Sequence, residues 1–329
     1  EPFSLLRDDA RRGLEGQHWM KLGDYYYLIY AVNGCCGPGS DYAVSVARSK
    51  NLRGPYEKYA GNPILHGGEG VQSCGHGTVV TTPDGRMFFL CHAYLSGENF
   101  FLGRQPILSR IELGEDGWLH FEGGETALLR RPLPLPGTAQ EPVKDFADDF
   151  SSPRIRPEWS WNYPYAVPDV EQADGRLCLS GRAKEGVHTG VAFCLRALTT
   201  DYTLETACLA RPAGWSGLTL YGDDRNLLVW GLQDGRLAVR LVRDGREELL
   251  GGPLAVPADV PVYLRMEVRG GGPVGAIVAI SDSEGNVRGY AVEPGELLQW
   301  DRVARPGLYY EGPETSFAEF EYVRMNRVR

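Results

Sequence analysis

Short runs of aromatic or alternating residues, each closed by a turn signal, dominate the first 130 positions. Residues 25–30 are Tyr-Tyr-Tyr-Leu-Ile-Tyr, and residues 42–48 alternate apolar and small positions in the two-residue period of a strand. The Pro-Asp-Gly sequence at 83–85 lies between two apolar runs and predicts a hairpin, because glycine supplies the positive φ that the turn needs. Residues 107–113 predict a further strand. No amphipathic helix longer than two or three turns is predicted.

The character of the chain changes at residues 130–145. Three prolines at alternate positions there cannot belong to a central strand, because proline lacks the ladder donor, so the segment predicts an extended linker. After it, turn signals separate alternating runs every 8–15 residues, as in an antiparallel sandwich or jelly roll. The pattern therefore predicts an all-β chain with one domain over 1–129 and a second over 146–329.

Composition and charge narrow the class of protein. Of 329 residues, 43% are hydrophobic, which suits a buried core, and the net charge of −9 disfavours a nucleic acid as partner. No apolar run reaches the roughly 18 residues that a membrane span needs. The sequence contains no phosphate-loop, dinucleotide-binding or nucleophile-elbow motif, so no nucleotide cofactor is expected. Seven scattered cysteines favour a reducing, cytoplasmic location, with secretion or a periplasmic location as the alternative.

Glu15 is the first candidate for chemistry. It precedes Gly16 and the apolar residues Trp19 and Met20, just ahead of the aromatic run. A carboxyl group held against aromatic surface keeps its proton more readily, which a general acid working near neutral pH needs. The alternative is an exposed loop glutamate.

The segment around Glu15 resembles glycoside hydrolase family 43. In that family a Glu-Gly-Pro sequence precedes Gly-Tyr-Tyr-Tyr-Leu, and here Gln17 stands in place of the proline. Residues 42–57 are similar to the family's Ala-Arg-Ser-Lys-x-Leu-x-Gly-Pro-Tyr-Glu stretch. Further short motifs follow in the family's order: Gly75-His76-Gly77, Pro83-Asp84-Gly85, His92-Ala93, Leu102-Gly103-Arg104 and Asp116-Gly117-Trp118. The resemblance covers residues 14–118 and implies part of a five-bladed β-propeller with β-xylosidase or α-L-arabinofuranosidase activity.

The resemblance also implies residue roles. Glu15 would protonate the leaving glycosidic oxygen, and Arg104 would line the sugar subsite, unless it forms only a surface salt bridge. His76 would lie at the propeller centre near a structural Ca²⁺ or its waters and near the substrate. The alternative for His76 is a structural histidine satisfied by backbone groups.

The Gly-Cys-Cys-Gly sequence at 34–37 leaves two interpretations open. Adjacent cysteines can form a strained vicinal disulfide on a loop that reaches the active-site rim. Alternatively, Cys35 and Cys36 are free thiols that pack as small apolar groups.

The second domain resembles the concanavalin-like jelly roll of xylosidase-type members of the family. Its closing run at 317–322 fits a last strand. The aromatic residues Trp159, Trp161, Tyr163 and Tyr165 form either a platform for sugars or, the preferred interpretation, part of the packing.

A partner for the acid is missing from the sequence. Inverting hydrolysis needs a second carboxylate to activate water, and the family's two aspartates precede the Glu-Gly motif by a long stretch. Only 14 residues precede Glu15, and Asp8 and Asp9 there resemble a solvated charge run. We therefore expect about two propeller blades, completed by an N-terminal propeller fragment or a second polypeptide that carries the base. The alternative is a catalytically inactive carbohydrate-binding or structural subunit, instead of an enzyme acting on plant-wall oligosaccharides.

Overall fold

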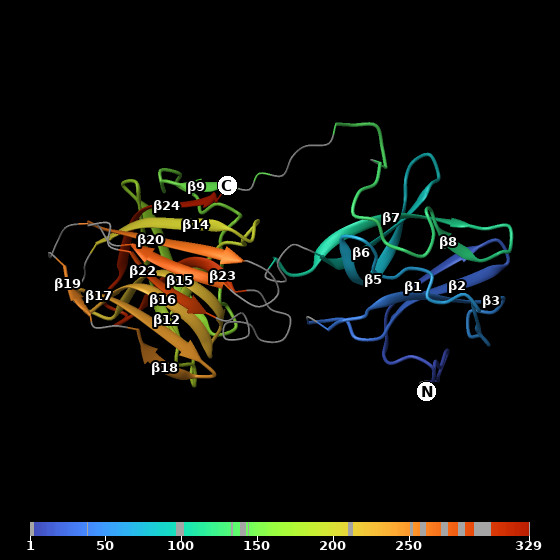
Figure 1. Cartoon of the computed structure of the whole chain (residues 1–329), viewed down its shortest axis with the longest axis horizontal. Coiled ribbons are helices and arrows are strands. Elements are labelled where there is room, and N and C mark those ends of the chain that lie inside the picture. The colour runs from blue at the N-terminus through green and yellow to red at the C-terminus, as the bar shows by residue number, and fades with distance from the viewer. Residues whose placement is uncertain are drawn as a thin grey trace. The chain divides into compact units, whose positions relative to one another are not determined.

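The computed structural model describes most of the chain as two units, residues 1–141 and 142–329 (Figure 1). The described residues are 3–37, 39–96, 102–132, 134–138, 143, 145–209, 213–250, 253–256, 261–270, 276–281, 287–292 and 304–328, with backbone alone over 276–281 and 287–292. These residues form no α-helix, and so none of them belongs to a helix that could cross a membrane. The prediction of an all-β chain is confirmed.

The first unit contains two antiparallel sheets of four strands each, in the orders β1-β2-β3-β4 and β5-β6-β7-β8. The strands are β1 (Leu14–Leu22), β2 (Tyr25–Val32), β3 (Ala43–Ser49), β4 (Glu57–Lys58), β5 (Val71–Thr81), β6 (Met87–Leu95), β7 (Gln105–Leu113) and β8 (Leu119–Phe121). Each sheet has the size and the sequential order of a propeller blade, so the expected two blades are present.

One apolar core joins the two blades. Ile29 and Val46 of the first sheet pack in the same cluster as Phe89 and Ile111 of the second, and all four are nearly inaccessible to solvent. The Pro-Asp-Gly hairpin forms as predicted between β5 and β6, with Gly85 at φ +85°. The core fixes β5 against the first blade, and this contact positions the candidate site.

The second unit is a sandwich of two larger antiparallel sheets. The first sheet has the order β10-β13-β23-β15-β16-β17-β18, with β19 also paired to β17, and the second has the order β11-β12-β24-β14-β20-β21-β22, with β9 paired to β24. The strands are β9 (Phe146–Asp148), β10 (Ser160–Trp161), β11 (Ala166–Ala173), β12 (Arg176–Ala183), β13 (Val191–Cys194), β14 (Tyr202–Leu209), β15 (Trp215–Asp223), β16 (Asn226–Gln233), β17 (Arg236–Arg243), β18 (Arg246–Leu249), β19 (Leu254–Ala255), β20 (Pro261–Gly270), β21 (Ala276–Ser281), β22 (Val287–Val292), β23 (Arg305–Glu311) and β24 (Ala318–Arg327). The last strand therefore contains residues 318–322 of the closing run that the sequence predicted.

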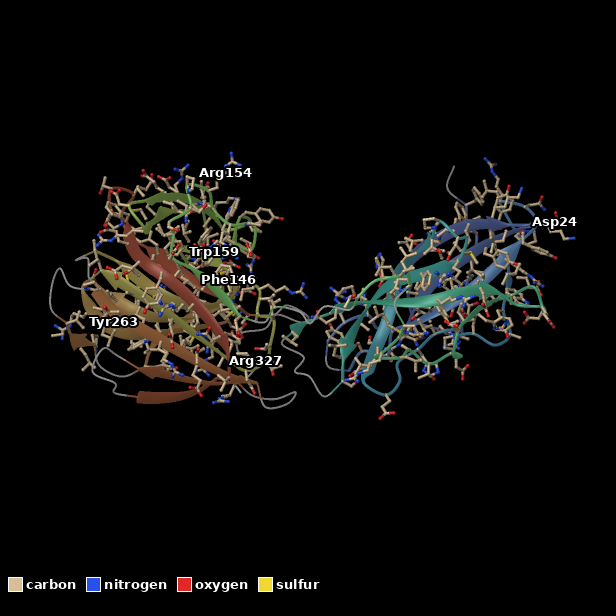
Figure 2. The ribbon with its side chains drawn as sticks, turned by 90° about the horizontal axis from the view of Figure 1, so that it is seen from above. Asp24, Phe146, Arg154, Trp159, Tyr263 and Arg327 are labelled. Carbon is tan, nitrogen blue, oxygen red and sulfur yellow. A yellow bond between two sulfur atoms is a disulfide. The ribbon has the colours of Figure 1, made fainter. Side chains whose placement is uncertain are left out.

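The aromatic cluster of the second unit divides into core and surface. Trp159 is buried, stacks on Phe193 with ring centroids 4.5 Å apart and lies beside Phe146 (Figure 2). Tyr165 packs against the buried cluster around Trp215, whereas Trp161 and Tyr163 are exposed. The preferred interpretation, packing, therefore holds for Trp159 and Tyr165 and not for the exposed pair.

Candidate functional site

Glu15 lies immediately before a β-bulge in β1. Glu15 pairs with Ala31 and His18 pairs with Ile29, so β1 has one more residue than β2 over this interval. Gly16 occupies the bulge with φ +59°, and a Cβ there would lie 2.8 Å from the Cα of His76. Only glycine therefore lets the strand turn here while β5 approaches so closely.

The bulge places Glu15 and Trp19 on opposite faces of the first sheet. Trp19 pairs with Leu28, whose side chain belongs to the cluster on the face turned away from β5. The ring of Trp19 stacks on Tyr56 with centroids 6.5 Å apart. The expectation that Trp19 supplies the aromatic surface beside Glu15 is therefore wrong, because the extra residue reverses the alternation between them.

Tyr42 is the aromatic neighbour of Glu15. Its hydroxyl donates a hydrogen bond of 2.7 Å to Glu15 Oε1, and its side chain is only 1% exposed. Burial raises the pKa of the Tyr42 hydroxyl, and the hydrogen bond and charge of Glu15 raise this pKa further. Tyr42 therefore stays protonated and acts as a fixed donor that orients the carboxylate.

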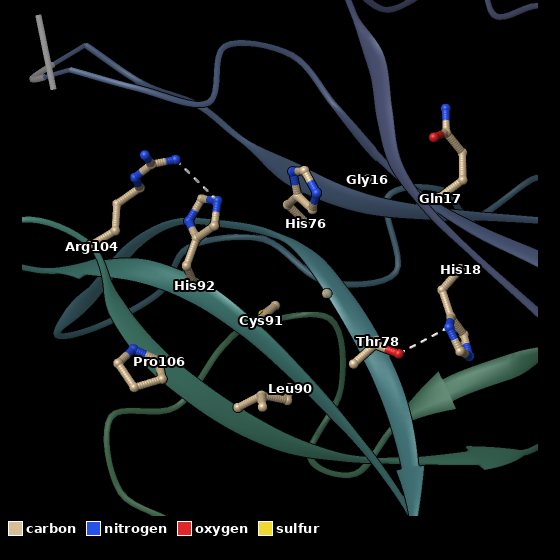
Figure 3. Close-up of a pocket in the computed structure, with 11 residues that line it drawn as sticks. Gly16, Gln17, His18, His76, Thr78, Leu90, Cys91, His92, Arg104 and Pro106 are labelled. Atoms are coloured by element: carbon tan, nitrogen blue, oxygen red, sulfur yellow. Dashed lines mark hydrogen bonds between the residues drawn. The ribbon is translucent and has the colours of Figure 1, made fainter. Parts of the chain in front are cut away.

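An open pocket of about 860 Å³ lies beside Gly16, between the two blades (Figure 3). His76, His92 and Arg104 line this pocket, and so do His18 and Thr78. His18 Nδ1 lies 3.0 Å from Thr78 Oγ1. Burial lowers the pKa of His18, which favours its neutral form. The volume falls within the roughly 300–1,000 Å³ of small-molecule sites.

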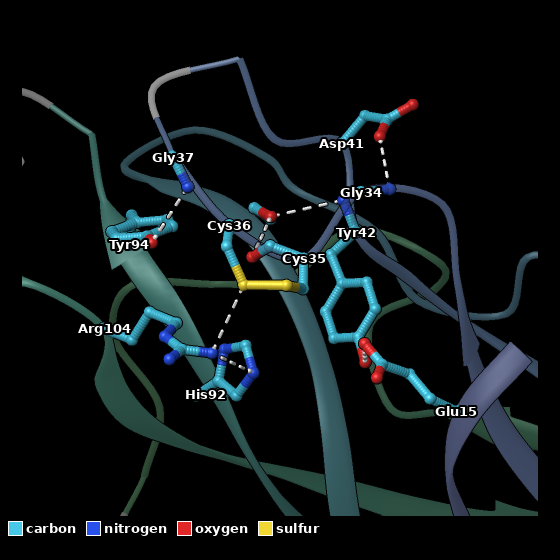
Figure 4. The surroundings of a disulfide bond; sticks show 11 residues. Glu15, Gly34, Cys35, Cys36, Gly37, Asp41, Tyr42, His92, Tyr94 and Arg104 are labelled. Atoms are coloured by element: carbon cyan, nitrogen blue, oxygen red, sulfur yellow. Dashed lines mark hydrogen bonds between the residues drawn. A yellow bond between two sulfur atoms is a disulfide. The ribbon is translucent and has the colours of Figure 1, made fainter. Parts of the chain in front are cut away.

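Arg104 and Glu15 are linked through two stacked rings. Arg104 Nη1 lies 3.5 Å from His92 Nε2, and the His92 ring stacks on Tyr42 with centroids 5.6 Å apart and planes inclined by 12°. Figure 4 shows Arg104 on one side of His92 and Tyr42 and Glu15 on the other. The structure thus brings two of the three predicted site residues into one chain of contacts, and His76 lies 6.4 Å from His92 between ring centroids.

Cys35 and Cys36 form a disulfide with each other. Cys36 Sγ lies 3.6 Å from Arg104 Nη1 (Figure 4). Of the two interpretations left open by the sequence, the structure shows the disulfide, next to a candidate site residue.

The residues that line the pocket do not fit a directly bound calcium ion. Calcium prefers several oxygen ligands, above all carboxylates. The described lining offers imidazoles, a guanidinium group, the Gln17 amide and the Thr78 hydroxyl, but no Asp or Glu side chain. Over the described ranges, no three His, Cys, Asp or Glu side chains are grouped so that they could hold a metal ion. This set of side chains therefore does not form a direct calcium site.

The interpretation of Asp8 as part of a solvated charge run is wrong. Asp8 is 8% exposed, lies 3.2 Å from Lys58 Nζ and accepts a hydrogen bond of 3.5 Å from the Tyr30 hydroxyl. Asp9 does fit the interpretation, since it forms an exposed ion pair with Arg7. Asp8 is thus held in a structural ion pair.

Sequence reasoning missed Tyr42 and His92 as parts of the site. Both lie in segments interpreted only as strands or family motifs. Counting residues from the hairpin does not give this arrangement, because the register of β5 and β6 shifts on both sides of the pair Gly75–His92. A Cβ on Gly75 would lie 2.5 Å from the Tyr42 ring. The small residue opposite His92 makes room for the ring on which His92 stacks.

Comparison with known proteins matches both units. Residues 7–119 match the model of glycosyl hydrolases family 43, and residues 147–293 match that of the beta xylosidase C-terminal concanavalin A-like domain. The chain is 29% identical over 255 residues to a xylosidase/arabinosidase 43B of Humicola insolens, covering 72% of this chain and 44% of the relative. It is 25% identical over 301 residues to a beta-xylosidase of Bacillus subtilis, covering 82% and 55%. The chain thus spans about half the length of these curated relatives.

Solved structures agree with this fold along nearly the whole chain. A xylan beta-1,4-xylosidase from Bacillus halodurans superposes with a TM-score of 0.78 at 22% identity, over 98% of this chain and 67% of that one. The family 43 protein BlXynB from Bacillus licheniformis gives 0.77 at 21% identity, over 100% and 68%. Residues 7–119 thus match glycosyl hydrolase family 43, and the solved structures show the fold, part of a propeller joined to a concanavalin A-like domain.

Proposed function

We propose that the first unit supplies the general-acid side of a glycosidase site. The site would release terminal xylosyl or arabinofuranosyl residues from plant cell-wall oligosaccharides, with inversion. The observation that carries the proposal is the Glu15 carboxylate held by the buried Tyr42 hydroxyl, in contact through His92 with Arg104. The names of the relatives, which include xylosidases and arabinosidases, support this class of substrate.

Each residue has a chemical role in this proposal. Glu15 delivers a proton to the glycosidic oxygen as the bond to the sugar breaks. Arg104 offers a planar set of donors that suits the hydroxyl groups of a pentose or an ionised carboxylate. Tyr42 keeps the carboxyl group of Glu15 pointed toward the pocket side of the sheet.

The base of the reaction comes from outside these residues in our proposal. Inversion requires a second carboxylate that activates a water molecule, and the two carboxyl groups lie about 6.5–9.5 Å apart. The described pocket lining contains no carboxylate, and Glu15 adjoins it only through Gly16. Asp8 is paired with Lys58. We infer that a further propeller segment, on the same polypeptide or on a second one, supplies an aspartate. The relatives' greater length supports this inference.

Glu15→Gln tests the assignment of the acid. In a preparation that hydrolyses nitrophenyl xylosides or arabinofuranosides, the variant should lose roughly 100- to 10,000-fold in rate on substrates with poor leaving groups. It should lose much less on activated aryl glycosides, because their leaving groups depart without a proton. The measurement is kcat/KM across aryl glycosides of graded leaving-group pKa.

Glu57→Gln is the matched control for this substitution. Glu57 is an exposed glutamate of the same blade that lies 3.5 Å from Arg48, whereas Glu15 accepts the hydrogen bond of Tyr42. It should leave both classes of substrate unaffected. Equal small losses for Glu15→Gln on both classes would remove Glu15 from the role of acid. Sugar binding without hydrolysis in every preparation would favour an inactive carbohydrate-binding subunit instead.

A further inference from the structure

The loop that carries the disulfide is held at both ends by polar contacts. The Gly34 amide donates to Asp41 Oδ1 at 2.9 Å, and the Asp41 amide donates back to the Gly34 carbonyl at 3.1 Å. The Gly37 amide donates to the Tyr94 hydroxyl at 3.3 Å, which ties the loop to β6. The position of the disulfide is therefore set by the first blade and by the second.

Cys35 is connected to Tyr42 through the hydroxyl group of Ser73. The Cys35 carbonyl accepts a hydrogen bond of 3.5 Å from Ser73 Oγ, and the same oxygen of Ser73 accepts one of 3.2 Å from the Tyr42 amide. The disulfide loop thus contacts the residue that orients Glu15.

Cys36 is connected to Tyr42 through side chains. Cys36 Sγ contacts Arg104, Arg104 contacts His92, and His92 stacks on the Tyr42 ring. Together with the contacts of Cys35, these form a closed circuit from Tyr42 through both cysteines and back to Tyr42. The Cys35–Cys36 bond is the one covalent cross-link in this circuit that a reductant opens.

We propose that the Cys35–Cys36 disulfide is a positioning element of the site, which holds the Arg104 guanidinium beside His92. Both cysteines are half-buried, so a small reductant reaches them. Opening the bond lets the two side chains rotate independently and removes the fixed sulfur from Arg104, while the cores of the two blades stay intact. Arg104 should then also bind sugar less tightly, an expectation that rests on the function proposed above.

The reactivity of Arg104 toward phenylglyoxal tests the positioning directly. The full chain is labelled before and after treatment with tris(2-carboxyethyl)phosphine, which breaks the sulfur–sulfur bond, leaves two thiols and takes an oxygen atom from water to become the phosphine oxide. Peptide mass spectrometry then gives the labelling rate of Arg104 relative to Arg110. Arg110 serves as internal reference because its partners, Glu112 and Glu122, are remote in sequence from the loop.

The relative labelling of Arg104 should rise severalfold on reduction. The double substitution Cys35→Ser with Cys36→Ser should show the raised rate without reductant. Cys178→Ser, which removes a half-buried thiol of the second unit, should behave like the unchanged protein. An unchanged ratio of Arg104 to Arg110 after confirmed reduction would overturn the proposal. This result is independent of hydrolysis; in an active preparation, reduction should raise KM more than it lowers kcat.

Discussion

The contact between Tyr42 and Glu15 combines a buried donor with an exposed acceptor. The Tyr42 side chain is almost fully enclosed, whereas Glu15 is exposed at the residue level. Water can replace the hydroxyl at the carboxylate, so the hydrogen bond contributes modestly to stability. Its larger effect is geometric, because the ring of Tyr42 is held by His92 on one face and by the close approach of Gly75.

Tyr42→Phe separates these two effects. The free energy of unfolding should fall by about 0.5–1.5 kcal/mol, the usual net contribution of one hydrogen bond, because the phenyl ring keeps the stacking on His92. Tyr163→Phe, at an exposed position, should change it little. Urea denaturation checks both. A loss for Tyr42→Phe no larger than that for Tyr163→Phe would show that the hydrogen bond contributes nothing.

Alkaline pH should destabilise the fold, because buried tyrosines have a higher pKa in the folded chain than in the unfolded chain. Burial raises the pKa of Tyr42, and likewise that of Tyr30, Tyr202 and Tyr221. Below the ordinary tyrosine pKa of about 10, the folded and unfolded states are both protonated and the stabilisation is fully present. Above it, the unfolded chain releases protons that the folded chain retains, so the free energy of unfolding falls as pH rises.

The free energy of unfolding, measured in one buffer series, should therefore be lower at about pH 11 than at about pH 8. Tyr42→Phe should lose less over this interval, because one of the retained protons is gone. A loss as large as that of the unchanged protein would mean that the Tyr42 pKa is not raised in the folded state.

At the scale of elements, the bulge in β1 decides where Glu15 points. Gly16 and Gly23 offer a matched pair, since both lie on the β1–β2 hairpin at φ +59° and +55°. A Cβ at Gly23 meets nothing within 4 Å, whereas one at Gly16 meets the His76 backbone at 2.8 Å. The two positions share backbone strain but differ in steric room.

Gly23→Ala should cost roughly 1–2 kcal/mol of unfolding free energy, the strain of an L-residue in the left-handed region. Gly16→Ala should cost about 1–3 kcal/mol more, the usual range for overpacking, and should disturb the contact of Glu15 with Tyr42. Chemical denaturation of the two variants in parallel gives the difference. Equal losses would mean that His76 moves away freely and that the bulge tolerates a side chain.

Most strands were predictable because each is a short alternating run closed by a turn residue with its own backbone requirement. The turn between β5 and β6 is an example, since Gly85 adopts φ +85°, as the Pro-Asp-Gly sequence predicted. The bulge was not predictable, because alternation alone places residues 15 and 19 on the same face. The pairing of His92 with Gly75 and the buried ion pair of Asp8 likewise depend on contacts between strands that single-sequence periodicity does not contain.

At the scale of the whole molecule, the first blade has a second apolar cluster on the face turned away from β5, and a groove lies over this cluster. Leu5, Leu6, Leu14 and Leu28 line a groove together with the half-exposed Trp19 on the first blade. Isolated apolar residues on a surface are ordinary, but a contiguous apolar groove marks an interaction surface. The proposed further propeller segment would cover such a face, since blades pack through apolar faces.

Trp19→Lys tests whether this face is used. The substitution places a charge in the groove and should weaken pairing with a separately produced propeller segment by tenfold or more, an interaction energy of about 1.4 kcal/mol. Binding measured by surface plasmon resonance gives the ratio, with Leu52→Lys as control at an exposed position outside the groove. Equal weakening by both variants, or by neither, would contradict a role for this groove.

Native mass spectrometry combined with a xyloside assay tests the central claim, that the site is shared between these residues and a further propeller segment. The 36.3 kDa chain alone should hydrolyse neither nitrophenyl xyloside nor arabinofuranoside. Activity should belong to a larger species that includes the additional segment, and should vanish when an aspartate of that segment is replaced by asparagine. A monodisperse 36.3 kDa monomer that hydrolyses xylosides unaided would contradict the account and place the base within these 329 residues.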